Sequence, residues 1–195
     1  IIAWYASRLG YSWLGQAMGD PRVSALAERL IRQEVGPALV AEYPHMAEAV
    51  ESFSKTFLER CNTSFKDPCT RVGRDPLRKL QRNERIFRSI DLAKKHGIDC
   101  SALEFGSALA LHYAVYCADS KDPESQLIRS VYHASGNIED VLTYSGPYNG
   151  KAYSGLDPVA DAALASADPL VKGNVNASNE SINANYESRD TDYRT

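Results

Sequence analysis

Between Arg71 and Arg88 the chain gathers the side chains best suited to binding an anion. This stretch holds seven basic residues and two acidic ones, although the net charge of the whole chain is −3. Gly73 and Pro76 restrict its backbone, and we predict an ordered loop over 62–81 that holds its arginines in fixed positions. Guanidinium groups held in this way can bind a phosphate or a carboxylate through two parallel hydrogen bonds.

A solvated basic surface is the competing interpretation of such a run of charge. It applies best to the basic residues on or before the next predicted helix, which recur at three-residue steps. These residues are Arg82, Arg85 and Arg88.

Apolar residues at helical spacing predict that the loop lies within an all-α fold. Helices are expected over 1–9, from 20 to a kink or an end at 36–37, over 46–60, over 83–97 with Asn83 as cap, over 103–117, from 122 onward, and over 137–142. The helix over 46–60 should bury one apolar face. That face comprises Met46, Val50, Phe53, Phe57, Leu58 and Cys61. Ser101 and Glu104 predict a capping box for the helix over 103–117, which is apolar nearly all round and should be central.

Composition divides the chain into three parts. Residues 1–144 carry the helical pattern and are predicted to form the one packed domain. Residues 145–171 begin rich in Gly, Tyr and Ser and could add one weak helix, so we predict a weakly ordered extension. Residues 172–195 consist mainly of Asn, Ser, Asp and Glu, and we predict a disordered tail because they have too little apolar surface to bury.

Several classes of function are excluded by composition. The acidic balance, with no aromatic residues among the arginines of the basic stretch, argues against nucleic-acid binding. No apolar run approaches the roughly 18 residues that a membrane span requires. The four cysteines form no C-x-x-C pair, so we expect no metal and interpret them as thiols of a cytoplasmic protein. His112 lies in the central apolar helix and is expected to be a core histidine, since no carboxylate is placed by sequence to tune it.

The ten residues from Arg71 to Leu80, RVGRDPLRKL, carry a family resemblance. They resemble the R-V-G-R-x-P-L-R-K-L signature of the mannitol-1-phosphate 5-dehydrogenase family, among the polyol-specific long-chain dehydrogenases. The likeness extends from about Ile1 to Gly136. The supporting segments are Phe65-Lys66-Asp67, Glu84-Arg85-Ile86 and Ala110-Leu111-His112-Tyr113. The family often has Asn-Pro where this chain has Asn62-Thr63, and the region after Gly136 matches little.

This resemblance implies a multi-helical C-terminal domain of the 6-phosphogluconate-dehydrogenase-like type, which binds a polyol phosphate. It implies interconversion of mannitol 1-phosphate and fructose 6-phosphate, with NAD bound by an N-terminal Rossmann domain as the intramolecular partner. The sequence has no G-x-G-x-x-G fingerprint, so no cofactor is expected on this chain.

The family's catalytic lysine, asparagine and histidine come just before the segment that resembles Ile1–Tyr5. The chain opens inside an apolar pattern without an N-cap, as a chain cut within a helix would. We therefore assign no catalytic residue here and expect the chain alone to be inactive.

The resemblance also assigns binding residues. The wider family contacts its polyol through an arginine and a lysine eight residues apart, and Arg71 and Lys79 have that spacing. Arg74 and Arg78 stand where the phosphorylated subfamily has arginines, and are expected to bind the phosphate. These four cationic groups should meet at a concave surface. The alternatives are a loop that grips nucleic acid and a non-catalytic helical interaction or anion-binding module.

Overall fold

The computed structural model describes residues 1–61, 66–80, 84–118 and 121–136, together with Asp140 and the backbone of a small hairpin. The hairpin pairs β1 (Pro147–Tyr148) antiparallel with β2 (Lys151–Ala152). The expected cap Asn83, the expected helix over 137–142 except Asp140, and the expected tail over 172–195 lie outside the described residues. So does the expected extension over 145–171, apart from the hairpin.

The described part of the chain is otherwise helical, as predicted. In chain order its elements are α1 (Ile2–Arg8), α2 (Leu14–Ala17), α3 (Pro21–Glu28), η1 (Arg29–Val35), α4 (Gly36–Glu42), η2 (Pro44–Met46), α5 (Ala47–Cys61), α6 (Cys69–Gly73), α7 (Pro76–Lys79), α8 (Arg85–Lys95), α9 (Ser101–His112), η3 (Tyr113–Cys117) and α10 (Pro123–Ser135). No helix among the described residues is both long enough and apolar enough to cross a lipid bilayer.

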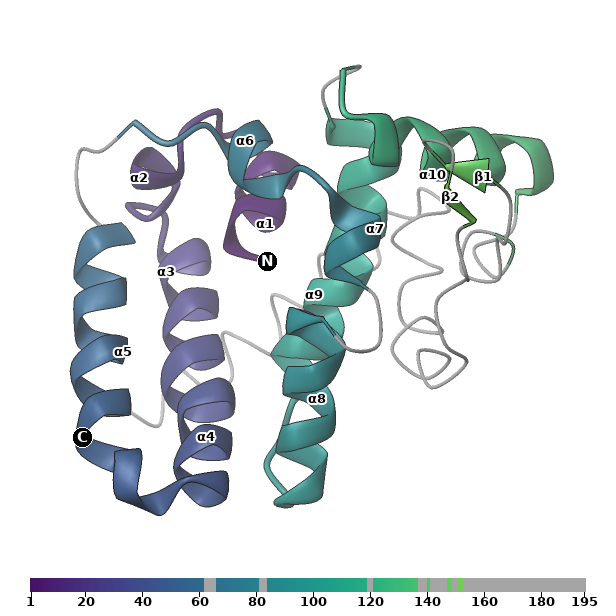
Figure 1. Cartoon of the computed structure of the whole chain (residues 1–195). Helices are drawn as coiled ribbons and strands as arrows, with labels where there is room; N and C mark the ends of the chain where they lie inside the picture. The colour runs from purple at the N-terminus through teal and green to yellow at the C-terminus, as the bar shows by residue number, and fades with distance from the viewer. Residues whose placement is uncertain are drawn as a thin grey trace.

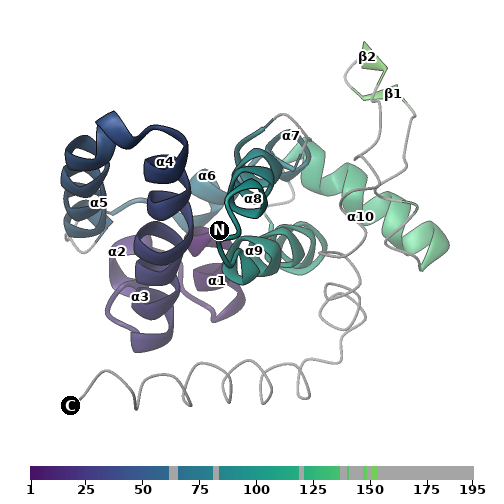
Figure 2. The same ribbon diagram turned by 90° about the horizontal axis from the view of Figure 1, so that it is seen from below.

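The helices form two neighbouring groups joined at one end. Figure 1 shows α3, α4 and α5 on one side, with α8 and α9 beside them and α10 beyond. The short helices α1, α2, α6 and α7 lie toward the upper end of this view. Seen from below, the amino end lies at the centre of the array beside α9 (Figure 2). The first helix is therefore a central element, and its residues Ile2 to Ala6 are all buried.

The long helix formed by α9 and η3 is central, as its all-round apolar composition predicts. Leu109, Leu111 and Tyr113 are fully buried within it. A π-helical turn, η3, ends the helix, and the backbone N–H of Ala118 donates to the Tyr113 carbonyl at 2.8 Å. The Arg129 side chain of α10 donates to the Val115 carbonyl at 3.0 Å, which ties the next helix to this end.

The capping box predicted at the start of α9 is wrong. Ser101 is the first residue of the helix, and the N-cap position belongs to Cys100, which makes no side-chain capping bond. The cap comes instead from η1, where the two carboxylate oxygens of Glu34 accept from the backbone N–H groups of Ala102 and Leu103 at 2.8 and 2.9 Å. A distant carboxylate can satisfy these N–H groups as well as a local side chain can.

The break expected at Gly36-Pro37 is a change of helix type. The chain stays helical from α3 through the π-helical η1 into α4. Pro37 is the second residue of α4 and directly follows the π-helical segment, so the helix continues through the proline with a local change of register. A Cβ on Gly36 would lie 2.6 Å from the Ile31 carbonyl oxygen, so this register requires glycine.

The predicted core face of α5 is largely wrong. Of its six apolar residues only Leu58 is fully buried, while Phe53 is 66% exposed and Met46, in η2, is 43% exposed. The helix packs at the edge of the molecule against α4 (Figure 1). Because one neighbour covers only a narrow stripe, the small Ser54 is buried there, with its hydroxyl donating to the Val50 carbonyl at 2.7 Å.

Candidate functional site

The basic segment is ordered, but its described residues are helical and do not form the loop that its glycine and proline predict. Its described residues form two short helices, α6 and α7, which carry Arg71 and the pair Arg78-Lys79. Asp75 lies between them in the left-handed region with φ 57°, and Pro76 begins α7 at a position suited to proline. Helices this short bury too few residues to show an apolar period, which explains why the pattern missed them.

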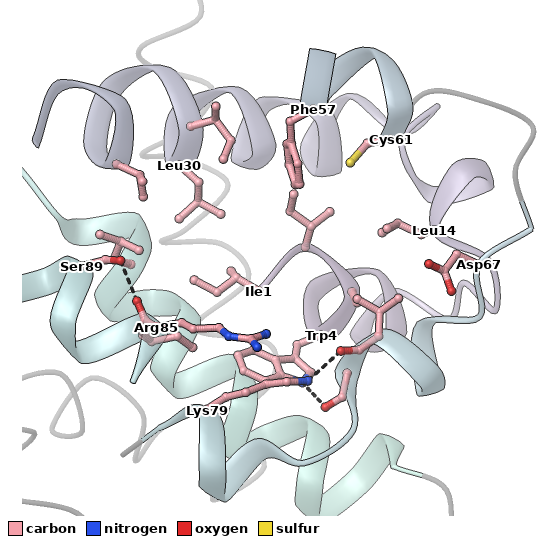
Figure 3. A pocket seen from close by; sticks show the side chains of 18 of the residues that line it. Ile1, Trp4, Leu14, Leu30, Phe57, Cys61, Asp67, Lys79, Arg85 and Ser89 are labelled. Atoms are coloured by element: carbon pink, nitrogen blue, oxygen red, sulfur yellow. Dashed lines mark hydrogen bonds between the residues drawn. The ribbon is translucent and has the colours of Figure 1, made fainter. Parts of the chain in front are cut away.

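A cavity of about 650 Å³ lies between this segment and the rest of the fold. Figure 3 shows its wall, to which Ile1 and Trp4 contribute from the amino end. Most of the lining is apolar, and its apolar residues include Leu14, Leu30, Ile31, Val35, Phe57 and Leu103. The polar side chains on the lining are Arg60, Asp67, Lys79, Arg85 and Ser89. The cavity therefore combines an apolar wall with a few charged groups, as small-molecule sites commonly do.

Lys79 is the predicted residue that lines the cavity. Its ammonium donates to the backbone carbonyl of Val72 at 2.8 Å and to that of Arg74. The same nitrogen lies 5.8 Å from the centroid of the Trp4 ring, within reach of a cation–π interaction. Burial lowers the pKa of Lys79, against the opposing effect of Asp75. The ammonium is thus held against the cavity wall.

Trp4 and Gly73 fix the wall behind this ammonium. The indole Nε1 of Trp4 donates to the Gly73 carbonyl at 2.7 Å in a buried contact. A Cβ on Gly73 would lie 3.0 Å from both the Trp4 ring and the Tyr113 ring. The absence of a side chain at Gly73 therefore lets α6 approach α1 and η3 closely.

Arg71 lies outside the cavity lining but holds a group that is part of it. Its guanidinium binds Asp67 through two bonds, Nε to Oδ1 at 2.7 Å and Nη2 to Oδ2 at 2.6 Å. Asp67 lines the cavity, and its carbonyl accepts from the Leu14 N–H at 3.0 Å. The structure therefore places Arg71 beside the cavity, orienting a carboxylate.

Arg74 and Arg78 do not line the cavity. Their side chains are 63% and 43% exposed, and each approaches the carboxylate of Asp75, at 3.7 and 3.5 Å. The four expected cationic groups are therefore not brought together. Lys79 reaches the cavity, Arg71 borders it, and the other two lie apart from it.

Sequence reasoning missed two groups that α8 supplies. Arg85, assigned above to a solvated surface, is the first residue of α8 and lines the cavity with Ser89 one turn later. Their spacing of four residues places both on one face of a helix, and this was the signal available in the sequence. Asp67 was missed as well, although it stands four residues before Arg71.

The described residues offer neither a metal site nor a reactive thiol. No group of three or more His, Cys, Asp or Glu side chains among them could hold a metal ion. All four cysteines are free, and burial raises the pKa of Cys69 and of Cys100 to about 11, which keeps both thiols protonated. The described part of the chain also contains no parallel sheet that could bind a dinucleotide.

His112 lies in the interior and outside the cavity. It is 7% exposed, and its Nδ1 lies 3.9 Å from the Cys117 Sγ. Burial, with Arg8 nearby, lowers the pKa of His112 to about 4. Its placement agrees with the interpretation as a core histidine, since it does not face the candidate site.

Comparison with known proteins gives one consistent result. Residues 1–145 match a family model described as the mannitol dehydrogenase C-terminal domain. A mannitol-1-phosphate 5-dehydrogenase of Exiguobacterium sp. is 29% identical over 143 residues, which are 73% of this chain and 37% of that protein. The protein of the same name from Lactiplantibacillus plantarum is 35% identical over 103 residues, 52% of this chain and 26% of that protein. The matched part of the chain thus spans 37% of the length of the first relative and 26% of the length of the second.

Proposed function

Because the chain belongs to the mannitol dehydrogenase C-terminal domain family, we propose that it is the substrate-binding part of an NAD-dependent oxidoreductase acting on a polyol phosphate. The reaction would interconvert mannitol 1-phosphate, which the names of the relatives contain, and fructose 6-phosphate, which the family resemblance implies. The cavity is the proposed substrate site. Its volume of about 650 Å³ is within the range of small-molecule sites.

The fixed ammonium of Lys79 is the observation that carries this proposal. Two of its three donors are engaged by the carbonyls of Val72 and Arg74, which leaves one for a substrate oxygen. Asp67 would accept hydrogen bonds from polyol hydroxyls while Arg71 holds it in place. A polyol phosphate needs both donors and acceptors at defined positions, and Lys79 and Asp67 supply one of each from different sides of the cavity.

Arg71, Arg74 and Arg78 keep their expected roles as proposals. Arg71 contributes to the polyol site through Asp67 and can reach the ligand at the border of the cavity. Arg74 and Arg78 would act as outer phosphate contacts. For that they must turn away from Asp75, and their exposed side chains leave them room to do so.

The chemistry would be completed by parts of a longer protein. NAD would supply the hydride acceptor, and we place it on an upstream Rossmann domain because this sequence has no glycine-rich fingerprint. The catalytic lysine, asparagine and histidine would precede Ile1. Since Ile1 lines the cavity, a helix leading into it would carry those groups to the substrate.

Ligand binding by the chain itself tests the proposal. Mannitol 1-phosphate titrated into the purified chain, followed by calorimetry, should give saturable binding. Binding should weaken at least tenfold in Lys79→Ala, which loses a charged donor. It should weaken less in Arg71→Ala, while Arg74→Ala should reduce the contribution of the phosphate.

Lys55→Ala, on the exposed side of α5, is the matched control and should bind as the wild-type chain does. Absence of binding, or a Lys79→Ala variant with unchanged affinity, would remove the cavity as the substrate site.

A further inference from the structure

Lys79 shares the cavity lining with two other cations, Arg60 and Arg85, and Arg85 is the one whose charge acts on Lys79. The family signature gives Arg85 no role. Figure 3 shows the Arg85 guanidinium directed inward between Ile1 and Trp4, on the same side of the cavity as Lys79. Within the described ranges no carboxylate lies within ion-pair distance of Arg85. Arg85 differs in this respect from the three arginines in and between α6 and α7, which are Arg71, Arg74 and Arg78; each of these faces a carboxylate.

Lys79 and Arg85 create a positive end in a cavity that is otherwise mostly apolar. Their charges interact, since Arg85 is among the cations whose repulsion adds to the burial that lowers the pKa of Lys79. Two cations beside an apolar wall repel each other, and an anion between them would remove that repulsion. The cavity carboxylate does not do so, because Asp67 lies at the other side of the view, next to Leu14, and is bound to Arg71 (Figure 3).

The start of α8 adds further donors at the same end. The helix has eleven residues, and its N-cap, Glu84, makes no side-chain hydrogen bond to the first turn. Free N–H groups at such a start carry a partial positive charge that favours an anion. Ser89 also lines the cavity, but its single O–H donor is engaged by the Arg85 carbonyl at 2.6 Å, so the added donors at this end are the N–H groups of the first turn.

We propose that Arg85 and Lys79 form an inner anion subsite that takes the phosphate group of a small phosphomonoester. Asp67 then faces the hydroxyl chain at the opposite end, so the two ends fix the direction in which the ligand lies. Arg85 thereby determines the preference for a phosphorylated over an unphosphorylated polyol. The identity of the polyol rests on the function proposed above, whereas the binding of phosphate by this subsite does not.

The two tryptophans provide a local measurement. Trp4 lies on the cavity wall, and Trp13 is not among its lining residues, so their indole N–H signals in a nitrogen-15 spectrum give a probe and an internal reference. Mannitol 1-phosphate, mannitol and inorganic phosphate are titrated separately into the full chain. The wild-type chain should bind mannitol 1-phosphate at least tenfold more tightly than mannitol. In each titration the Trp4 indole signal should shift as ligand is added, and the Trp13 signal should not.

Arg85→Gln removes the charge and should reduce this preference roughly tenfold, by losing a charge-assisted hydrogen bond, with mannitol affinity changed no more than about twofold. Arg85→Lys should keep most of the preference. Arg88→Gln removes an equivalent charge from the same helix away from the cavity, and should behave as wild type. Far-ultraviolet circular dichroism confirms that the variants are folded.

The outcomes separate the two proposals. If the wild-type chain binds mannitol 1-phosphate and Arg85→Gln leaves the preference unchanged, or weakens both polyols equally, the subsite is overturned while the proposed function stands. If no polyol binds, but inorganic phosphate shifts Trp4 in the wild type and Arg88→Gln and not in Arg85→Gln, the proposed function fails and the subsite stands. No response to any ligand overturns both.

Discussion

The charged side chains of the basic segment differ in the groups that accept their hydrogen bonds. Lys79 meets two backbone carbonyls and a tryptophan ring, which hold it at the cavity without neutralising it. Arg71 meets a carboxylate in a bidentate pair, so its charge is largely balanced before any ligand arrives. Groups of the same sign within one signature can therefore have different functions, one available to a ligand and the other holding its neighbour.

His112 gives a prediction for the dependence of stability on pH. Burial, with Arg8 nearby, lowers the pKa of His112 to about 4 in the folded chain. The unfolded chain binds a proton at this residue below roughly pH 6.5. The protonation of His112 therefore does not lower the free energy of unfolding above roughly pH 6.5. As the pH drops from there toward 4, it lowers the free energy of unfolding by at most about 3 kcal/mol.

Urea unfolding at a series of pH values measures this effect. His112→Leu should flatten the curve between roughly pH 6.5 and 4. His45→Ala, which removes an exposed histidine of η2, should leave the curve as in the wild type. If the free energy of unfolding depends on pH in the same way in the wild-type chain and in His112→Leu, the pKa of His112 is not lowered by folding.

The residues of the candidate site could be predicted only in part. The spacing of Lys79 from Arg71 pointed to the segment that the structure places at the cavity. Asp67, four residues from Arg71, was within reach of the same reasoning. Arg85 was not within reach, because an arginine at the start of an amphipathic helix has the pattern of a solvated charge. Only the packing of α8 against α4 and α9 places it on the cavity lining, where its side chain stays exposed.

At the scale of helices, elements that start with local signals were predictable. Asp20 accepts from the Arg22 N–H at 2.9 Å and Pro21 is the first residue of α3, as the Asp-Pro pair predicts. The start of α9 depends instead on Glu34, which is 68 residues away from Ala102 in the chain. No local pattern can show such a cap, and the nearby serine and glutamate gave a false signal.

Substitution of Glu34 and of Glu104 tests whether α9 is capped by the distant Glu34 or by the predicted box of Ser101 and Glu104. Glu34→Ala removes the acceptor for two buried N–H groups, and should lower the free energy of unfolding by about 2 kcal/mol. Glu104→Ala should cost no more than about 1 kcal/mol, because Glu104 forms a part-exposed ion pair with Lys94 at 2.8 Å and a weak contact with the Cys100 thiol, 3.8 Å from its Oε1.

Urea denaturation of both variants gives the comparison, with the exposed Glu48→Ala of α5 as reference. If Glu104→Ala lowers the free energy of unfolding as much as Glu34→Ala does, Glu104 caps α9 and the predicted capping box is correct.

At the scale of the whole molecule, the first helix is placed where the substrate is expected. α1 packs against α6 and α9, and Ile1 lies directly over Gly106, where a Cβ would come within 2.3 Å of it. The all-α class was predictable from helical periodicity alone. This central position was not, because periodicity shows that a helix has an apolar face without showing which helices cover it.

The same arrangement predicts that the chain alone has no dehydrogenase activity. Its described helices offer no dinucleotide site, and the proposed catalytic residues precede Ile1. The purified chain with NAD and mannitol 1-phosphate should produce no NADH, measured by absorbance, at any NAD concentration. Turnover by the chain alone would contradict the proposal that the cofactor site and the catalytic residues lie upstream of Ile1.

A fusion carries this prediction to the complete enzyme. The part of the Lactiplantibacillus plantarum relative that precedes the position matching Ile1 is joined to this chain, so that its last helix runs into α1. The fusion should oxidise mannitol 1-phosphate, because the cavity then receives both the catalytic groups and the cofactor. Lys79→Ala in the fusion should raise KM at least tenfold, and Lys55→Ala should not. A folded fusion that binds NAD and mannitol 1-phosphate without turning them over would show that the cavity is not where the catalytic groups meet the substrate.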